Sequence, residues 1–473
     1  MLMERGGDSE DDGGSAPPCP DSDPARNPSP PPGYDAEEEE EEEEEGGPEG
    51  DAIGNTVYSK HWLFGALTRL VQVAAEQGAG DPEAREELGE EDEEQLCKVW
   101  DMAADQDVAR FLQEFKAADI LLGAIAKSGS PRLTEICVGI LGNMACFPDA
   151  CCSISENEDL GVVLLLLLSD GDPPTLLETS RLLLTCLARP SAAPLWLERV
   201  RQQESVRQSL CFIMCSSTNV DLLLKVGELV DKLFDLDEEL MRSWITPQAQ
   251  PSTTDGEGPL HIAPCLLEAA KQLRSESPEG LEVYIHALQL LTTVDTGIQA
   301  LVEPEQVAEE LWALLSDVVC SDLCQPDDPA VTLQEQKTLL APVLAVLGAL
   351  FDLQGRPECC CPDRNLPLVG SLTRVLQYQQ ECQQGAAEDQ DVHLQILKET
   401  AAELLSGLLA GLPQEAVSEL VRTGALTEQS CLTAARSLLP QHCTAVRLFV
   451  AVLSQVEGQL AGALREEFPC LQL

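Results

Sequence analysis

An apolar stripe with helical spacing recurs six times along the chain. In the first copy the apolar residues stand at relative positions 0, 3, 4, 7, 8, 11 and 12, from Leu133 to Ala145. These positions share one side of an α-helix. The other copies begin at Leu176, Leu222, Val283, Leu339 and Leu397. Because a repeated helix buries such a stripe by stacking on its neighbours, the pattern predicts an all-α fold built as a solenoid.

The distance between copies indicates the kind of repeat. The first two spacings are 43 and 46 residues, within the range of armadillo and HEAT repeats. Later spacings of 61, 56 and 58 residues include Pro-, Gly- and Gln-rich segments. We therefore expect an armadillo/HEAT-like right-handed α-solenoid over residues 95–473, with loops near 246–259, 325–329, 355–362 and 379–391.

Three segments precede the predicted solenoid. Residues 1–51 are rich in Pro and Glu, include the run Glu37–Glu45, and are predicted to be a disordered acidic tail. Residues 52–77 are aromatic, with Tyr58, Trp62 and Phe64, and have two interpretations. A helix that caps the first repeat is favoured over an amphipathic helix that binds a partner. Residues 78–94 are expected to form an acidic linker.

The charge of the chain restricts its partners. The net charge is −53, of which −16 falls within residues 1–50 and −37 in the remainder. Such a body repels phosphate backbones, so we expect partner proteins with basic surfaces or tails and no direct binding of nucleic acid. The apolar run Leu160–Leu168 is too short to span a membrane. The polar N-terminus shows no secretory signal, which indicates a protein that is not secreted, and the oligomeric state is not predicted.

The sequence offers no convincing catalytic chemistry. None of the five His residues stands in a zinc-protease motif, and no Gly-rich phosphate loop is present. Cys pairs one helical turn apart, Cys211 with Cys215 and Cys320 with Cys324, lack further ligands at metal-site spacing, as does the cluster Cys359–Cys361. We therefore predict buried thiols, no catalytic residue, no cofactor and no metal, and hence no enzyme. A metal- or redox-responsive use of the Cys residues is the rival interpretation.

The stripe helices also suggest where a partner binds. In armadillo repeats the third helix lines a groove, and offsets 6 and 10 from the start of each stripe would face it. These candidate groove-facing positions are Gly139, Asn143, Leu182, Cys186, Glu228, Lys232, Gln289 and Thr293. Importin-type grooves repeat a Trp and an Asn four residues apart, whereas this chain has the Asn once. For Asn143 a hydrogen bond to the backbone of the neighbouring repeat is therefore the favoured role.

Several segments resemble the serum amyloid A-like family, also called synoviocyte proliferation-associated proteins. They are Thr56–Gly65, Pro131–Phe147, Asp172–Cys186 and Ser216–Asp237, whereas Gly355–Pro362 departs from the family. The resemblance implies an armadillo-like protein of the nucleus, with the cytoplasm as a second location, that promotes proliferation of synovial fibroblasts under pro-inflammatory stimuli. It implies no catalytic residue, cofactor or defined binding site. The alternative function is an acidic escort or chaperone for basic nuclear proteins.

Overall fold

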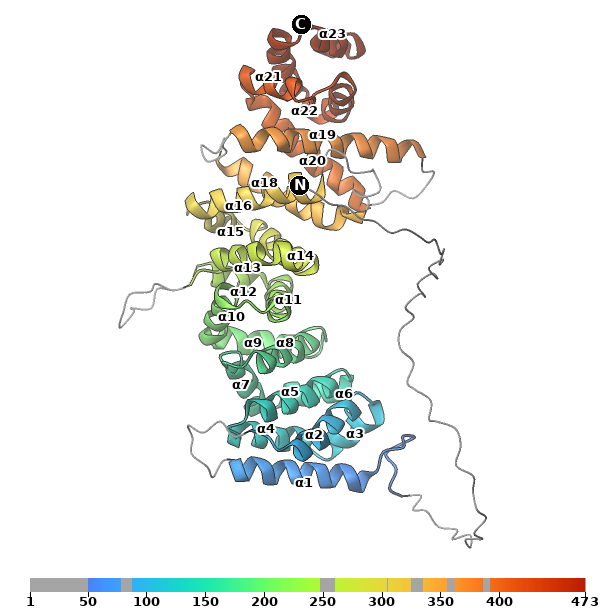
Figure 1. Ribbon diagram of the computed structural model, residues 1–473, viewed down its shortest axis with the longest axis vertical. Helices are drawn as coiled ribbons and strands as arrows, with labels where there is room; N and C mark the ends of the chain where they lie inside the picture. The colour runs from blue at the N-terminus through green and yellow to red at the C-terminus, as the bar shows by residue number, and fades with distance from the viewer. Residues whose placement is uncertain are drawn as a thin grey trace, which may run out of the picture. The chain divides into compact units, whose positions relative to one another are not determined.

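The computed structural model describes residues 50–77, 87–246, 260–303, 305–324, 335–354, 362–385 and 392–472. Within these ranges the regular structure is helical, apart from an isolated bridge between Ala52 and Ser59. The helices follow one another in groups of three along the chain (Figure 1). This confirms the predicted armadillo-like solenoid.

The first helix of each group is short, with eight to ten residues. These helices are α3 (Gln106–Glu114), α6 (Pro148–Glu156), α9 (Ala193–Gln202), α12 (Glu238–Ile245), α15 (Asp295–Val302) and α21 (Gln414–Arg422). The second helices are α1 (Lys60–Gln77), α4 (Ala117–Lys127), α7 (Glu158–Leu167), α10 (Glu204–Ser216), α13 (Ile262–Glu276), α16 (Glu305–Asp317), which continues into the π-helix η1 (Val318–Leu323), and α19 (Pro362–Gly385).

The third helices are α2 (Glu90–Met102), α5 (Pro131–Ala145), α8 (Pro173–Leu187), α11 (Val220–Leu236), α14 (Pro278–Thr292), α18 (Lys337–Gln354) and α20 (Val392–Gly411). All of these except α2 carry one of the six apolar stripes found in the sequence. Each packs against the third helix of the next group, from α2 to α20 and on to α22. The six predicted stripe copies therefore form one continuous ladder of neighbouring helices.

The starts of α5, α8 and α14 follow from their local sequence. Ser130, Asp172 and Ser277 each accept a hydrogen bond from a backbone N–H of the first turn, and each is followed by Pro. Such side chains satisfy N–H groups that have no partner within the helix, and Pro fits the first turn because it has no N–H to lose. Cap and Pro together fix where the stripe begins.

The chain closes with α22 (Glu428–Val456), α23 (Gly458–Glu467) and the 3-10 turn η2 (Pro469–Leu471). Helix α22 is long and apolar enough to match a membrane span by length and composition. Its backbone leaves helical geometry at His442, two residues after Pro440, and divides the helix into two parts. These parts pack against α19, α20 and α23, as the second and third helices of a last group.

Two predicted boundaries were wrong. Helix α2 begins at Glu90, inside the segment predicted as an acidic linker over 78–94. Its four acidic first-turn residues favour a helix N-terminus, and Leu96 and Val99 are buried. Helix α19 runs to Gly385, inside the loop predicted over 379–391. Residues 1–49 of the predicted tail, the loop segments 247–259 and 325–329, and Cys359–Cys361 lie outside the described residues.

Candidate functional site

The ladder of third helices presents one polar side between α2 and α14. On α8, α11 and α14, partly exposed polar residues follow one another at intervals of three or four positions beside the buried stripe, and α2 and α5 carry partly exposed residues at wider spacing. We call this surface the third-helix face. It comprises Glu93, Trp100, Arg132, Glu135, Asn143, Glu178, Arg181, Thr185, Lys225, Glu228, Asp231, Lys232, His286 and Gln289.

Helices α2 and α5 are joined through an indole and an amide. A Cβ on Gly139 would lie 2.1 Å from Cε2 of Trp100, so the glycine makes room for the indole. Asn143 donates from Nδ2 to the main-chain oxygen of Trp100 at 2.8 Å, which is the backbone role favoured for it from sequence. Gly139 is thus covered by Trp100, and this end of the face presents an indole.

Helices α5 and α8 are joined by Arg181. Its guanidinium pairs with Glu178 at 2.6 Å and donates to the carbonyl of Gly139 at 3.3 Å. The predicted groove positions on α8, Leu182 and Cys186, are fully buried. The partly exposed positions Arg181 and Thr185 stand one residue earlier, because α8 turns Leu182 and Cys186 into the interior of its repeat.

Charged pairs continue along α11. Lys225 bonds Glu228 at 2.7 Å, and Lys232 bonds Asp235 at 3.0 Å. All four residues lie on α11, which begins after the cap residue Asn219. The predicted positions Glu228 and Lys232 are therefore partly exposed, but each is already paired within its own helix.

Helices α11 and α14 are joined by His286 and Asp231, whose Nδ1 and Oδ1 lie 2.6 Å apart. The hydrogen bond to Asp231 raises the pKa of His286, while burial opposes the rise. The two predicted positions on α14 differ in setting. Gln289 is partly exposed on the face, whereas Thr293 is exposed just after the helix and donates to the carbonyl of Leu290 at 2.7 Å.

These pairs are suited to recognition. The side chains of Arg132, Arg181, Lys225 and Lys232 are 31–38% exposed, and each is bonded to a carboxylate three residues away on its own helix. Ion pairs this open are worth roughly 0–1 kcal/mol each. A partner can therefore exchange them for its own charges at little cost, and the face offers adaptable donors and acceptors over five helices.

Comparison with known proteins identifies relatives that match 89–90% of the chain. A protein named saal1 from Danio rerio is 56% identical over 428 residues, which cover 89% of this chain and 90% of that protein. Protein SAAL1 from Homo sapiens is 50% identical over 450 residues, 90% of this chain and 95% of that protein. The chain belongs to the SAAL1 family. The family model described as the SAAL1 C-terminal domain matches residues 206–446.

Solved structures similar to this SAAL1-family chain are helical repeat proteins of low identity. A chain from a study of a phosphorylation switch in the interaction between cadherin and beta-catenin is 14% identical, with a TM-score of 0.49 over 85% of this chain and 64% of that chain. A designed armadillo repeat protein is 15% identical, with a TM-score of 0.40 over 60% of this chain and 99% of that one.

The structure brings three thiols of this SAAL1-family chain together. Cys211 and Cys215 on α10 lie close enough to Cys265 on α13 to influence its pKa. The hydrogen bond with Cys211, together with burial, raises the pKa of Cys265 to about 12, so the thiol stays protonated. Within the described ranges, no group of three or more His, Cys, Asp or Glu residues is arranged to hold a metal ion.

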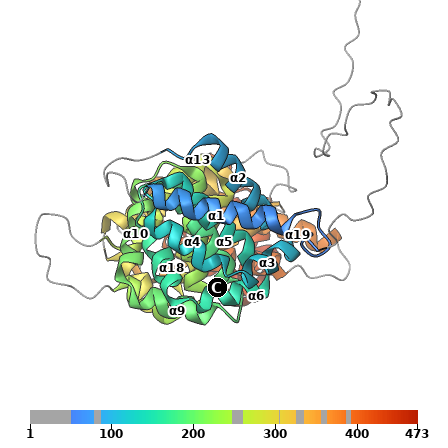
Figure 2. The same ribbon diagram turned by 90° about the horizontal axis from the view of Figure 1, so that it is seen from below.

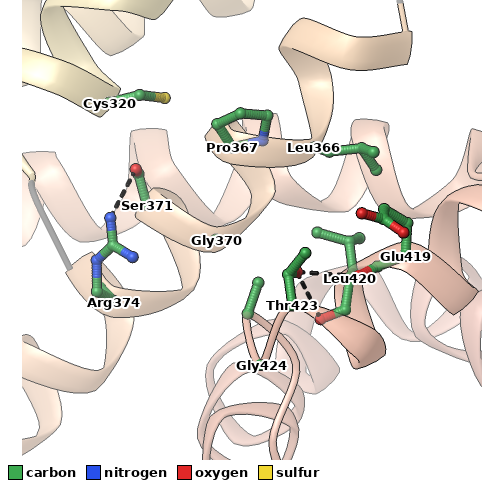
Figure 3. Close-up of a pocket in the computed structure, with 11 residues that line it drawn as sticks. Cys320, Leu366, Pro367, Gly370, Ser371, Arg374, Glu419, Leu420, Thr423 and Gly424 are labelled. Atoms are coloured by element: carbon green, nitrogen blue, oxygen red, sulfur yellow. Dashed lines mark hydrogen bonds between the residues drawn. The ribbon is translucent and has the colours of Figure 1, made fainter.

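A pocket of about 600 Å³ opens between α19, α21 and η1 (Figure 3). Its apolar lining includes Leu366, Pro367 and Leu420. The polar groups on its wall are bonded to one another: Arg374 donates to Ser371 at 3.0 Å, and Thr423 donates to the carbonyl of Glu419 at 2.9 Å. The polar groups that line the pocket are therefore already hydrogen-bonded within the protein. Among the described residues, no short first helix stands between α18 and α19.

Sequence reasoning missed three residues of the third-helix face. Trp100 lies at the start of the predicted solenoid, on a helix that carries none of the six stripe copies, and Arg181 stands one position before a predicted site. Asp231 was passed over because only offsets 6 and 10 were considered. A signal for Arg181 was present, since a charged residue within a stripe helix marks the exposed side of that helix.

Proposed function

We propose that this SAAL1-family chain is a non-enzymatic scaffold that binds a partner protein along the third-helix face. The observation that carries the proposal is the row of exchangeable acid–base pairs on α5, α8 and α11. Each pair is on the exposed side of a helix whose opposite side is buried. A rigid ladder with adaptable polar groups supports binding of an extended segment that crosses several repeats.

The charge of the chain supports a basic partner. Residues 51–473 carry a net charge of −37, so every approach to the face runs through a negative field. Arg and Lys side chains of a partner would replace the cations of the face in their pairs with Glu135, Glu178 and Glu228. The match of opposite charges speeds association and excludes acidic competitors.

Affinity purification tests where the partner binds. The full chain and a chain without residues 1–50 serve as parallel baits, each at low and at raised salt. A partner held by both baits at raised salt is the expected result, because the face lies outside residues 1–50 and also offers uncharged groups such as Trp100 and Gln289 that salt does not screen. Loss of every partner with the acidic tail would contradict binding at the face.

An acidic escort for basic nuclear proteins is the second candidate function. It is supported by the −16 charge of residues 1–50 and the run Glu37–Glu45. The escort function predicts binding that requires the tail and collapses as salt rises. The same purification separates the two functions, since only the escort function fails when residues 1–50 are removed.

At the level of the cell, we propose a nuclear protein that promotes proliferation of synovial fibroblasts under pro-inflammatory stimuli. Membership of the SAAL1 family supports this proposal. The test is depletion of the protein in such cells, followed by rescue with the native chain. Rescue should restore cytokine-stimulated growth, and a fluorescent fusion should accumulate in the nucleus. Normal growth of depleted cells would contradict the role.

A further inference from the structure

Helix α1 is built like an internal helix although it stands at one end of the ladder of second helices (Figure 2). It packs against α2 and α4 through Leu63, Leu67 and Leu70, which are buried. The next second helix, α4, packs against α1 on one side and α7 on the other. Terminal repeats of solenoids need a polar outer face for solubility, so the composition of the opposite side of α1 is informative.

The opposite side of α1 carries mainly apolar or uncharged side chains over four turns, together with the charged residue Glu76. We call it the outer face of α1; its exposed residues are His61, Phe64, Gly65, Thr68, Val71, Gln72, Ala75 and Glu76. Phe64 is 47% exposed and Val71 48%. Positions 61, 64, 68, 71 and 75 alternate steps of three and four, which is the spacing of a seam between packed helices. In a chain with a net charge of −53, this face is suited to another helix.

Neighbouring aromatic residues enlarge the outer face of α1. Phe115, just after α3, meets Phe64 edge to face at a centroid distance of 5.3 Å and is itself 38% exposed. Trp62 and Tyr58 add partly exposed rings at 36% and 37%. Clustered exposed aromatic side chains of this kind are typical of binding hot spots.

The segment that leads into α1 is held in place before any partner binds. Asp51 accepts from the backbone N–H of His61 at 2.9 Å, and Ile53 is buried. Gly54 has a φ of +56°, where a Cβ would collide with Asp107, and the N–H of Asn55 bonds that Asp107 carboxylate at 3.2 Å. The aromatic surface therefore binds with little ordering cost.

We propose that the outer face of α1 binds an amphipathic helix of a partner protein, with an apolar stripe flanked by Lys and Arg. The partner's helix would pack on the outer face of α1, as α4 packs on its inner side, and so would extend the row of second helices. The basic flank matches Glu76, exposed on α1, and Glu90 and Glu91, exposed in the first turn of α2. A second copy of this chain, with its net charge of −53, would instead meet like charge.

Residues 1–49 do not themselves supply the helix. Beyond the first three residues their only large apolar side chain is Tyr34, and Pro recurs throughout. No apolar stripe with helical spacing is present there. The partner must come from another protein, and its site is separate from the third-helix face.

The test uses a helical peptide of 18 residues with Leu at helical spacing and Lys elsewhere, titrated at raised salt into the full chain. The double variant Phe64→Asp/Val71→Asp removes the apolar surface. Its matched control is Val162→Asp/Leu166→Asp on α7, whose side chains are 51% and 52% exposed. We expect at least about tenfold weaker binding for the first variant and none of that loss for the control.

Three results would overturn the proposal. They are equal affinity of the Phe64/Val71 variant, equal affinity for a peptide with Glu in place of Lys, and self-association of the native chain that the variant abolishes. Circular dichroism establishes that both variants fold.

Thr68→Arg, which adds a charge and bulk at an exposed position, is the second variant and should weaken binding in the same way. Peptide binding that survives Thr185→Lys separates this site from the third-helix face.

Discussion

The indole of Trp100 on α2 lies against Gly139 on α5, where any larger residue would meet the ring. The contact joins the first two third helices, and Asn143 holds the backbone of Trp100 from the same side. A single glycine therefore decides how closely α2 approaches the ladder. It also decides that this end of the third-helix face presents an aromatic ring.

Gly139→Ala should destabilise the chain although Ala favours helices. The added Cβ displaces Trp100, and overpacking of this kind costs about 1–3 kcal/mol. Gly123→Ala on α4 is the matched control, since nothing lies within 4 Å of its Cβ position and the helix gains up to about 1 kcal/mol. Chemical denaturation followed by Trp fluorescence measures both. Equal stabilisation of the two variants would contradict the packing described.

Arg207→Met should lower the free energy of unfolding by about 1–3 kcal/mol. The Arg207 side chain is 3% exposed, pairs with Glu204 and donates to the carbonyl of Leu260 at 2.8 Å. Methionine leaves that carbonyl without its donor. Arg242→Met, at an exposed pair with Glu238, should change stability little. Urea denaturation compares the two, and an equally small effect for both would rule out a structural role for Arg207.

The pair of His286 and Asp231 should make stability depend on pH. Because the folded pKa of His286 is raised, its contribution is fully present below the unfolded value of about 6.5 and is lost as pH rises through the folded pKa. The side chain is 44% exposed, so screening keeps the effect below about 1 kcal/mol. Asp231→Asn should remove this dependence. NMR titration of the His286 ring checks it, and an unchanged midpoint in Asp231→Asn would refute the pairing.

Thiol labelling should follow burial. Cys146 and Cys470 are exposed, whereas Cys137 is fully buried and burial raises its pKa to about 12. A maleimide at neutral pH should therefore label the first two in the native chain and Cys137 only after unfolding. Mass spectrometry of timed samples gives the order. Labelling of Cys137 as fast as Cys146 in the folded chain would contradict the buried position of α5.

The ladder could be predicted from the sequence because an apolar stripe on a helix is buried by packing against a neighbouring helix. The stripes that begin at Leu133, Leu176 and Leu222 can be buried only by stacked helices. In the structure they lie on α5, α8 and α11. The loops were less predictable. Helix α2 begins at Glu90 because its later turns bury Leu96. This burial depends on the packing of α5 against α2, which the local sequence does not show.

The exposed positions of the face were predictable only in part. Glu228 and Gln289 are partly exposed as expected, but a shift of one residue turns a helix by about 100°. On α8 that shift buries Leu182 and exposes Arg181. The rotation depends on contacts with other helices of the repeat, such as that between Cys186 and Cys151, which a single helix pattern does not contain.

Binding of the purified partner to charge variants tests the central claim most directly. Thr185→Lys/Gln289→Lys adds two positive charges to the third-helix face, and Gln208→Lys/Gln306→Lys adds the same charge to exposed sites on α10 and α16. At raised salt, the account predicts at least about tenfold weaker binding for the first pair and unchanged binding for the second. Equal affinity of both variants would show that the partner binds elsewhere.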